Sequence, residues 1–407
     1  MRRALVGLAA VVGSAAVISA CQEKLTSPAE CPGLCPGGPQ TLFETVLSPL
    51  AGLDSSFHTY VAPGQGAALL VSSGLPVSED RAVYRFISRQ DSIAVRDTAR
   101  AYTVDSVLIT LNIVARDTLV GGLKVVLFHL PSGVDSTATF ESVDPQLVDA
   151  NLIDTIAVPD SVHSGQIQTI LRGADVARVA IPPGTGGQLA VGLRMTAAAP
   201  TGIRVGSLAG GNGATFVSYL TVDVPDTGAV RNQFLSRATE FNTFVTQNRP
   251  LPDPTVLTVG GDSSSRSILR FELPPQLKDS ATIVRATLEL IPAHPLLGLP
   301  GDPAVMEAHA VLADLGAKSP LTADPQFIVT DTLPEGGTDT LRLEVTRVVR
   351  LWQASTDRPP AIFLLLAKAS EAATFTRPAF GSTNPASPVG PPRILITYQL
   401  PFPFEIP

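Results

Sequence analysis

The chain has 407 residues, with 29 Lys and Arg against 36 Asp and Glu, which gives a formal net charge of −7 at pH 7. Nucleic-acid-binding proteins usually carry a basic surface, so we expect no nucleic-acid partner. Hydrophobic residues make up 44% of the chain and charged residues only 16%, and 36 Pro and 33 Gly divide the apolar runs into short pieces. This pattern is typical of short β-strands joined by turns.

The first 20 residues have the features of a secretory signal. Arg2 and Arg3 form a basic start, and the apolar stretch 4–16 is too short to span a membrane, which takes about 20 apolar residues. The signal ends at Ile18-Ser19-Ala20-Cys21, which resembles the bacterial lipobox. The resemblance implies that residues 1–20 are a lipoprotein signal peptide and that Cys21 is acylated. The alternative is an ordinary secretory signal with a chance cysteine.

The lipobox resemblance also predicts where the mature protein resides. Cleavage before Cys21 removes two arginines and no acid, so the formal net charge becomes 27 − 36 = −9. Stable anchoring needs at least two acyl chains, and a bacterial lipoprotein cysteine usually carries several. Gln22 is not the aspartate that holds enteric lipoproteins at the inner membrane, which favours the outer membrane. We expect a cell-envelope protein whose N-terminal lipid binds the membrane.

Residues 21–55 are predicted to be a flexible tether, because the stretch from Gln22 to Gln40 is too rich in Pro and Gly to bury a core. Within it, Pro32-Gly33 favours a turn between Cys31 and Cys35 that would bring their Cα atoms within about 7 Å. Cysteine pairs outside the cytosol usually oxidise. The sequence therefore predicts a disulfide between these two residues and, with no histidine nearby, no metal site.

From residue 56 onward, short segments alternate apolar and polar residues as half-buried antiparallel strands do. Ser78-Glu-Asp-Arg-Ala-Val-Tyr-Arg-Phe86 and Ser263-Ser-Ser-Arg-Ser-Ile-Leu-Arg-Phe271 share Ser, Arg, Arg and Phe at an offset of 185 (271 − 86). Such a repeat favours an internal duplication, although any two β-domains look somewhat alike at this level. We expect two tandem, jelly-roll-like β-sandwich domains, at residues 56–230 and 231–407.

One short helix is predicted in the second domain. Val348, Val349 and Trp352 fall on one helical face, and Thr346 is predicted to be the N-cap. Trp352 is the only tryptophan, and its apolar neighbours predict a core anchor rather than a ligand platform.

The second half also resembles a known family. Arg266-Ser-Ile-Leu-Arg-Phe-Glu-Leu273 is followed by strand patterns at 281–290 and 362–366, by the helix pattern, and by Pro392-Arg-Ile-Leu-Ile-Thr-Tyr398. This order is similar to the DNRLRE-type domain of secreted bacterial and archaeal proteins and to a group of jelly-roll carbohydrate-binding modules. The resemblance covers about 240–400, with a weaker version before it. It implies a β-sandwich with an accessory role and brings no catalytic residues.

No catalytic or metal site follows from the sequence, because the five histidines show no metal-ligand spacing. Asp160-Ser-Val-His163 and Gly261-Asp262-Ser263 resemble pieces of lipolytic hydrolases, but their order is reversed and no Gly-x-Ser-x-Gly elbow is present. Aromatic residues are only 5% of the chain, and many lie in predicted core strands. Tyr60, Tyr102 and Tyr219 are the remaining candidates for stacking on a sugar.

We therefore expect a lipid-anchored, non-catalytic envelope protein without a cofactor, which acts as a structural or interaction module. Its partner would be another envelope protein or a polysaccharide. The first alternative is a surface glycan-binding module. The second is a hydrolase with an unrecognised site, which a serine within hydrogen-bond reach of a histidine would favour.

Overall fold

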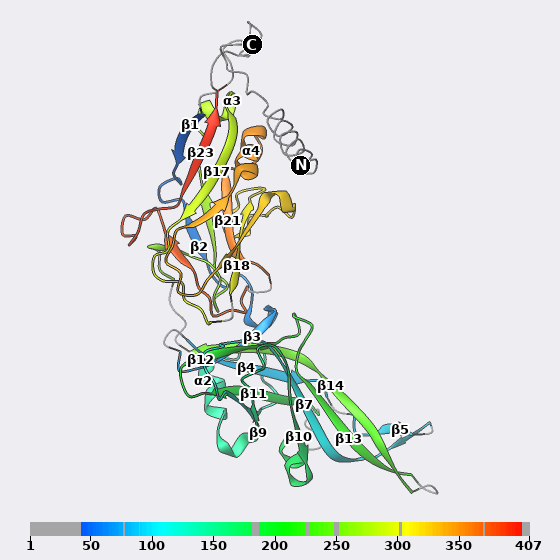
Figure 1. The fold of residues 1–407 in the computed structure, drawn as a ribbon. Coiled ribbons are helices and arrows are strands. Elements are labelled where there is room, and N and C mark those ends of the chain that lie inside the picture. Colours follow the sequence, from blue (N-terminus) through cyan, green and yellow to red (C-terminus); the bar gives the residue numbers. More distant parts are fainter. Residues whose placement is uncertain are drawn as a thin grey trace, which may run out of the picture.

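The computed structural model describes residues 42–400, apart from gaps at 76–77, 89, 96, 181–186, 225–227, 248–251, 301–302 and 369–370. The described chain folds into two β-sandwich lobes that lie one above the other in Figure 1. The expected all-β fold is therefore confirmed. The longest helix of the described residues, α4 (Thr346–Ala354), has nine residues.

The first lobe is built by the middle of the chain and is drawn mainly in cyan and green in Figure 1. Its strands follow the path β3-β12-β7-β13-β14-β4-β11-β8-β9, with β10 beside β7. The elements are β3 (Ala68–Ser73), β4 (Glu79–Phe86), β5 (Ile93–Val95), β6 (Thr98–Arg100), β7 (Thr103–Arg116), β8 (Lys124–Leu130), α2 (Phe140–Val143), β9 (Leu152–Ala157), β10 (Gly165–Arg172), β11 (Leu189–Thr196), β12 (Thr201–Gly206), β13 (Thr215–Val224) and β14 (Gly228–Gln247).

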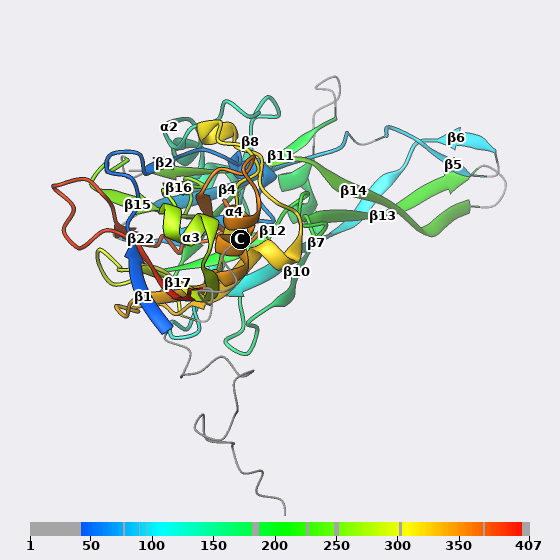
Figure 2. The same cartoon turned by 90° about the horizontal axis from the view of Figure 1, so that it is seen from above.

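Strand β14 joins the two sheets of the first lobe. Residues 228–238 lie antiparallel to β13, and residues 239–247 lie antiparallel to β4. The inner faces of the two sheets meet in one buried core, in which the ring centroids of Phe86 and Phe216 lie 4.5 Å apart. Seen from above, the hairpin of β13 and β14 extends away from the body of the molecule, as does that of β5 and β6 (Figure 2).

The second lobe combines the first two described strands with the C-terminal part of the chain. One sheet has the order β1-β23-β17-β20 and the other β19-β18-β21-β16-β2, with the pair β15-β22 as a separate small sheet. The elements are β1 (Leu42–Leu47), β2 (Ser55–Phe57), β15 (Val256–Thr258), β16 (Arg266–Arg270), α3 (Pro275–Asp279), β17 (Thr282–Leu290), β18 (Ala304–Ala310), β19 (Ile328–Leu333), β20 (Leu341–Glu344), α4, β21 (Ala361–Leu366), β22 (Ala379–Gly381) and β23 (Arg393–Gln399).

The two lobes repeat one strand order, as the duplicated sequence block predicts. The series β4-β11-β8-β9 corresponds to β16-β21-β18-β19, and β13-β7-β10 corresponds to β23-β17-β20. Strand β3 pairs with β12 as β15 pairs with β22. At the edge, β1 pairs with β23 and β2 pairs with β16, so together they take the place that β14 has in the first lobe.

The expected domain boundaries need correction at both ends of the first domain. Residues 42–57, expected in the tether 21–55 and at the start of the first domain, form β1 and β2 of the second lobe. The expected boundary at residue 230 falls inside β14, which belongs to the first lobe. Both errors have the same cause, because the alternation of a strand shows its buried face but not the strand with which it pairs.

The predicted helix is present as α4, and it buries Val348, Val349 and Trp352 in the second-lobe core. Trp352 is thus a core anchor, with its ring 5.8 Å from that of Phe271. The predicted N-cap is wrong by one position, since Thr346 is the first helical residue. Its Oγ1 accepts a hydrogen bond from a backbone N–H of β17 at 2.6 Å, which ties the helix to the sheet.

The lobes contact each other through a loop of the second lobe. Phe375 packs against the first-lobe core, and a Cβ added to Gly202 of β12 would lie 2.6 Å from the tip of its ring. Glycine at this position therefore lets the loop approach closely. At the same junction, the backbone N–H of Thr118 donates to the carbonyl oxygen of Pro300 at 3.3 Å.

Candidate functional site

A pocket of about 280 Å³ opens on the second lobe, beside the segment that leads into the first lobe. At one wall, Nδ1 of His58 lies 2.8 Å from Oγ of Ser265, which lies 2.9 Å from Oγ of Ser263. Arg377 also lines the pocket and forms an ion pair with Asp262. The pocket is therefore lined by two histidines, His58 and His294, by two serines, by Asp253 and by a guanidinium group.

A tight turn before β16 places these serines. Gly260 and Gly261 have φ angles of 69° and 72°, which glycine adopts readily, and Ser264 has a φ of 46°. The backbone groups of Gly260 and Ser265 donate hydrogen bonds to each other at 2.7 and 2.9 Å, which closes the turn. Asp262 and Ser263 lie at its tip.

The local environment of His58 favours the neutral form of its ring. Burial lowers the pKa of His58, and the positive charge of Arg377 lowers the pKa further. A neutral imidazole within reach of a serine is the arrangement that would favour a hydrolase.

The surrounding contacts do not complete a catalytic site. Ser265 is only 1% exposed, and in the described part of the chain the His58 ring hydrogen-bonds to Ser265 alone. Nucleophilic catalysis needs an accessible nucleophile and a third group that orients the histidine. The other predicted hydrolase fragment does not approach, because Asp160 lies in the first lobe, where it contacts Gly122 and Arg116 at 3.1 and 3.6 Å.

The serine turn instead holds the segment that enters the first lobe. The backbone N–H of Thr59 donates to the carbonyl oxygen of Ser263 at 2.6 Å, and that of Tyr60 donates to Ser264 at 3.3 Å. The backbone N–H of Val61 donates to Oγ of Ser264 at 2.9 Å. These bonds explain the polar turn as an anchor for the chain where it leaves the second lobe.

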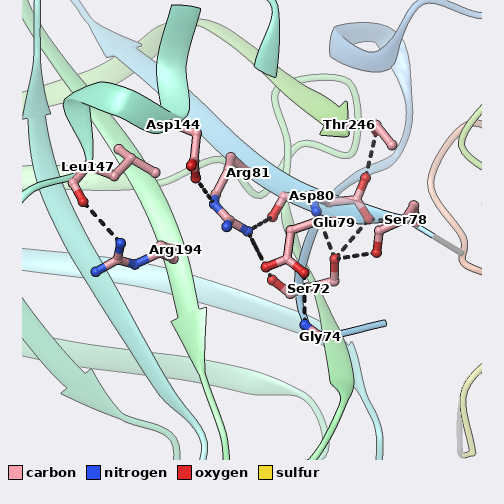
Figure 3. Close-up of polar contacts among 10 residues, drawn as sticks. All are labelled: Ser72, Gly74, Ser78, Glu79, Asp80, Arg81, Asp144, Leu147, Arg194 and Thr246. Carbon is pink, nitrogen blue, oxygen red and sulfur yellow. Dashed lines mark hydrogen bonds and ion pairs between the residues drawn. The ribbon is translucent and has the colours of Figure 1, made fainter. Parts of the chain in front are cut away.

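A second polar cluster lies at the start of β4, the equivalent place in the first lobe (Figure 3). The carboxylate of Asp80 accepts hydrogen bonds from the hydroxyls of Thr246, Ser72 and Ser78, at 2.6, 3.0 and 3.1 Å. Burial raises the pKa of Asp80 to about 6, against the effect of these hydroxyls, and the charge of Asp262 raises the pKa as well. The cluster stabilises a buried carboxyl group between two strands and the end of β14.

Arg81, beside Asp80, belongs to the same network (Figure 3). Its Nε donates to Asp144 at 2.8 Å and its Nη1 donates to Glu79 at 2.9 Å. The guanidinium carbon lies 5.2 Å from the ring centroid of Phe140, a cation–π distance. The charged groups of this cluster thus satisfy one another rather than face a ligand.

The described residues offer no metal site, since no three of their His, Cys, Asp and Glu side chains gather as ligands. None of the helices described is both long and apolar enough to cross a membrane. Cys21, Cys31 and Cys35, predicted to carry the lipid and the disulfide, lie outside the described residues.

The three tyrosines predicted as sugar-stacking candidates differ in their accessibility. Tyr60 is covered by the guanidinium of Arg266, 3.8 Å above its ring centroid. Tyr102 is partly buried and packs beside a small core cluster of the first lobe. Tyr219 is 40% exposed on the outer face of β13. The structure therefore leaves Tyr219 as the accessible candidate of the three.

Tyr219 belongs to a continuous apolar surface on the first lobe, which we call the Phe234 face. Tyr219 lies opposite Phe234 on β14, and Leu108 of β7 lies opposite both Val217 of β13 and Ile170 of β10. Phe234, Ile170 and Tyr219 are 63%, 47% and 40% exposed. Sequence analysis missed this face because these residues alternate with buried ones, and alternation does not show which side of a strand meets solvent.

Comparison with known families and with curated proteins finds no match for this chain. Among solved structures, the chain is similar to the C-terminal domain of the AgI/II polypeptide BspA of Streptococcus agalactiae, with 11% sequence identity and a TM-score of 0.17. The similarity covers 85% of this chain and 91% of that one. A TM-score this low carries no argument about fold or function.

Proposed function

We propose that this chain is a lipid-anchored, non-catalytic interaction module of the bacterial cell envelope, which binds its partner through the Phe234 face. The observation that carries the proposal is a continuous apolar surface on one sheet, in which Phe234, Ile170 and Tyr219 are exposed and the neighbouring Leu108 and Val217 are half-buried. Contiguous apolar surfaces of this kind mark interaction sites, because each Å² removed from water contributes about 25 cal/mol.

The position of the face within the molecule supports this role. The first described residue, Leu42, begins β1 in the second lobe, whereas the Phe234 face lies on the first lobe (Figure 1). Residues 22–41 connect Leu42 to Cys21, and twenty residues span at most about 70 Å. A lipid at Cys21 would therefore hold the second lobe near the membrane and leave the first lobe to reach outward.

The polar clusters support a binding role over catalysis. The serine turn accepts hydrogen bonds from the backbone of residues 59–61. Asp80 and Arg81 form their hydrogen bonds with other residues of the first lobe. The pKa of His58 is lowered and it lines the pocket, but its partner Ser265 is only 1% exposed, whereas a catalytic site needs an accessible nucleophile beside such a group.

Site-specific photo-crosslinking tests the proposed surface. A photoreactive phenylalanine analogue at position 234 should yield a crosslinked adduct of defined mass in intact cells. The same analogue at position 315 is the control, because Leu315 is 65% exposed on the second lobe. Equal, diffuse labelling at both positions would reject the Phe234 face as the binding surface.

Mass spectrometry tests the proposed anchor. The mature N-terminus should be an acylated Cys21, and Cys21→Ala should release the protein from membranes. An intact Met1 in the mature protein would contradict the lipoprotein assignment, while leaving the Phe234 face to be judged by crosslinking.

A glycan partner is the second candidate, favoured by the groups that border the face. Gln168 of β10 and Ser236 of β14 are exposed on its strands, so uncharged hydrogen-bonding groups share this surface with the two aromatic side chains. We expect retention of the protein on a neutral envelope polysaccharide, lost in the variant Tyr219→Ser/Phe234→Ser. A panel of polysaccharides that retains neither protein would leave a protein partner as the occupant.

A further inference from the structure

In each lobe one segment pairs with both sheets: β1 and β2 in the second lobe, and β14 in the first. We call these the closing segments, and each comes from the other repeat of the sequence. Strands β1 and β2 come first in the chain, and they complete the second lobe by pairing with β23 and β16. The body of the first lobe follows, and then β14, which completes the first lobe by pairing with β13 and β4. The body of the second lobe comes last. Each closing segment therefore stands directly before one body in the sequence but packs on the other.

The sequence supports this reading of the repeat. Phe57-His-Thr-Tyr-Val61 and Phe241-Asn-Thr-Phe-Val245 share Phe, Thr and Val at an offset of 184 (245 − 61), close to the offset of 185 between the blocks at Arg81 and Arg266. In the ladders this match is shifted by four residues, because Phe57 pairs with Arg266 whereas Val245 pairs with Arg81. The order of the strands along the chain therefore carries the argument: each repeat begins with its closing segment. The two repeats have exchanged these segments, as subunits do in domain swapping.

At the lobe junction, the end of β14 meets the stretch of chain that follows the first closing segment. The side-chain amide of Asn242 in β14 donates to the carbonyl oxygen of Gly64 at 3.0 Å. A Cβ on Gly64 would lie 2.3 Å from the backbone oxygen of Asn242, so the two backbone segments approach too closely to admit a side chain at position 64. Gly64 lies in the single 3₁₀ turn Pro63–Gln65, which separates the part bound to the second lobe from β3.

We propose that residues 42–61 are a donor segment that also closes the second lobe of another copy of this chain. The hinge of the exchange is the stretch 62–67, since the preceding residues 59–61 bind the serine turn of the second lobe. A copy that receives the donor would form the same strand pairs and the same turn contacts, because both belong to identical surfaces. The proposal is independent of what the Phe234 face binds.

The donor segment is the more easily released of the two closing segments. It makes six pairings with β23 and three with β16, whereas β14 makes nine with β13 and eight with β4. Of the buried side chains in the main core of the second lobe, Leu47 is the one that the donor contributes. Its outer side chains, Leu42 and Val46, are exposed. Release therefore leaves most of that core intact.

Cysteine pairs across the β1–β23 ladder test the proposal in the full mature chain, with Cys21, Cys31 and Cys35 replaced by Ser. Val46 lies opposite Leu395, within the Cα separation that a disulfide accepts. One preparation carries Val46→Cys and the other Leu395→Cys. After the two are mixed, unfolded in urea, refolded together and oxidised, we expect a disulfide-linked pair at twice the mass of the mature chain.

Two controls make the result decisive. The double variant Val46→Cys/Leu395→Cys should form the bond within one chain, which shows that the lobe folds and the geometry is right. A mixture of Val217→Cys and Ser236→Cys, directly opposite on β13 and β14, should give no linked pair, because β14 stays in its own lobe. Monomers alone from the first mixture, with the intrachain bond formed in the double variant, would overturn the proposal.

Discussion

Asp80 of the first lobe and Asp262 of the second are two carboxylates that interact across the lobe junction. Asp80 is the second residue of β4, and Asp262 lies in the turn just before β16, so each stands near the start of a corresponding strand of the two repeats. Asp80 accepts hydrogen bonds from three hydroxyls, whereas Asp262 pairs with Arg377. The arrangement of the lobes thus brings two acids near each other, and only one of them has a cation as its partner in these contacts.

This relationship predicts a loss of stability as the pH rises. Burial, followed by the charge of Asp262, raises the pKa of Asp80 to about 6 from its ordinary value of 3.8. Between these values the folded state keeps a proton that the unfolded state has released, so the free energy of unfolding falls with pH. The contribution of Asp80 is fully present below pH 3.8 and is lost as the pH passes 6, with a total of about 3 kcal/mol.

Urea unfolding at pH 4.5 and pH 7.5 measures this effect. Asp80→Asn removes the titrating group, so we expect its free energy of unfolding to fall less between the two pH values than that of the wild type. The comparison is needed because other acids, such as Glu289, have a lowered pKa and act in the opposite direction. Parallel pH profiles for the two proteins would show that Asp80 does not titrate in this range.

The repeated sequence block illustrates how much the sequence predicts. The shared Phe86 and Phe271 lie in the two cores, and the first shared arginine forms an ion pair in both lobes. Arg81 pairs with Glu79 and Asp144, which lie 2 and 63 residues away in the chain. The repeated block predicts where these arginines lie, but it does not predict their partners. The corresponding arginine of the second repeat, Arg266, pairs with a different acid, Glu371.

The partners of the edge strands were equally inaccessible to sequence analysis. Leu42–Leu47 has the composition of a strand, but the short segment stands between Pro- and Gly-rich stretches and pairs with β23 at the other end of the chain. His58 meets Ser265 across 207 residues for the same reason. The strand types follow from local periodicity, whereas the exchange of closing segments depends on long-range pairing.

The ion pair of Arg266 and Glu371 is predicted to stabilise the second lobe. Nη2 of Arg266 donates to the carboxylate of Glu371 at 2.8 Å, and both side chains are largely buried. Arg266→Met leaves the carboxylate of Glu371 buried without this cation, which costs about 3 kcal/mol. Arg285→Met is the matched control, because its pair with Glu344 is exposed and contributes less than about 1 kcal/mol. Equal losses in urea unfolding would contradict this ranking.

The contact between Gly64 of the hinge and Asn242 of β14 predicts a site that is sensitive to substitution. Gly64→Ala places a Cβ 2.3 Å from the backbone oxygen of Asn242, so the two backbone segments must move apart. We expect the free energy of unfolding to fall by about 2 kcal/mol. Gly133→Ala is the control, because no atom lies within 4 Å of its Cβ position. Differential scanning calorimetry should show a lower Tm for the first variant alone, and an unchanged Tm would mean that the junction adapts freely.

The exchange of segments also predicts that the lobes differ as isolated fragments. Residues 63–247 contain every strand of the first lobe, including β14, so this fragment should fold alone. Residues 252–400 lack β1 and β2, which leaves the edges of β23 and β16 unpaired and Leu47 absent from the core. We expect this second fragment to aggregate or unfold at a lower temperature, and a peptide of residues 42–61 added in excess to restore its Tm. Circular dichroism with a scrambled peptide as control separates specific closure from a general effect. A fragment 252–400 as stable without the peptide as with it would show that the second lobe does not need its donated edge.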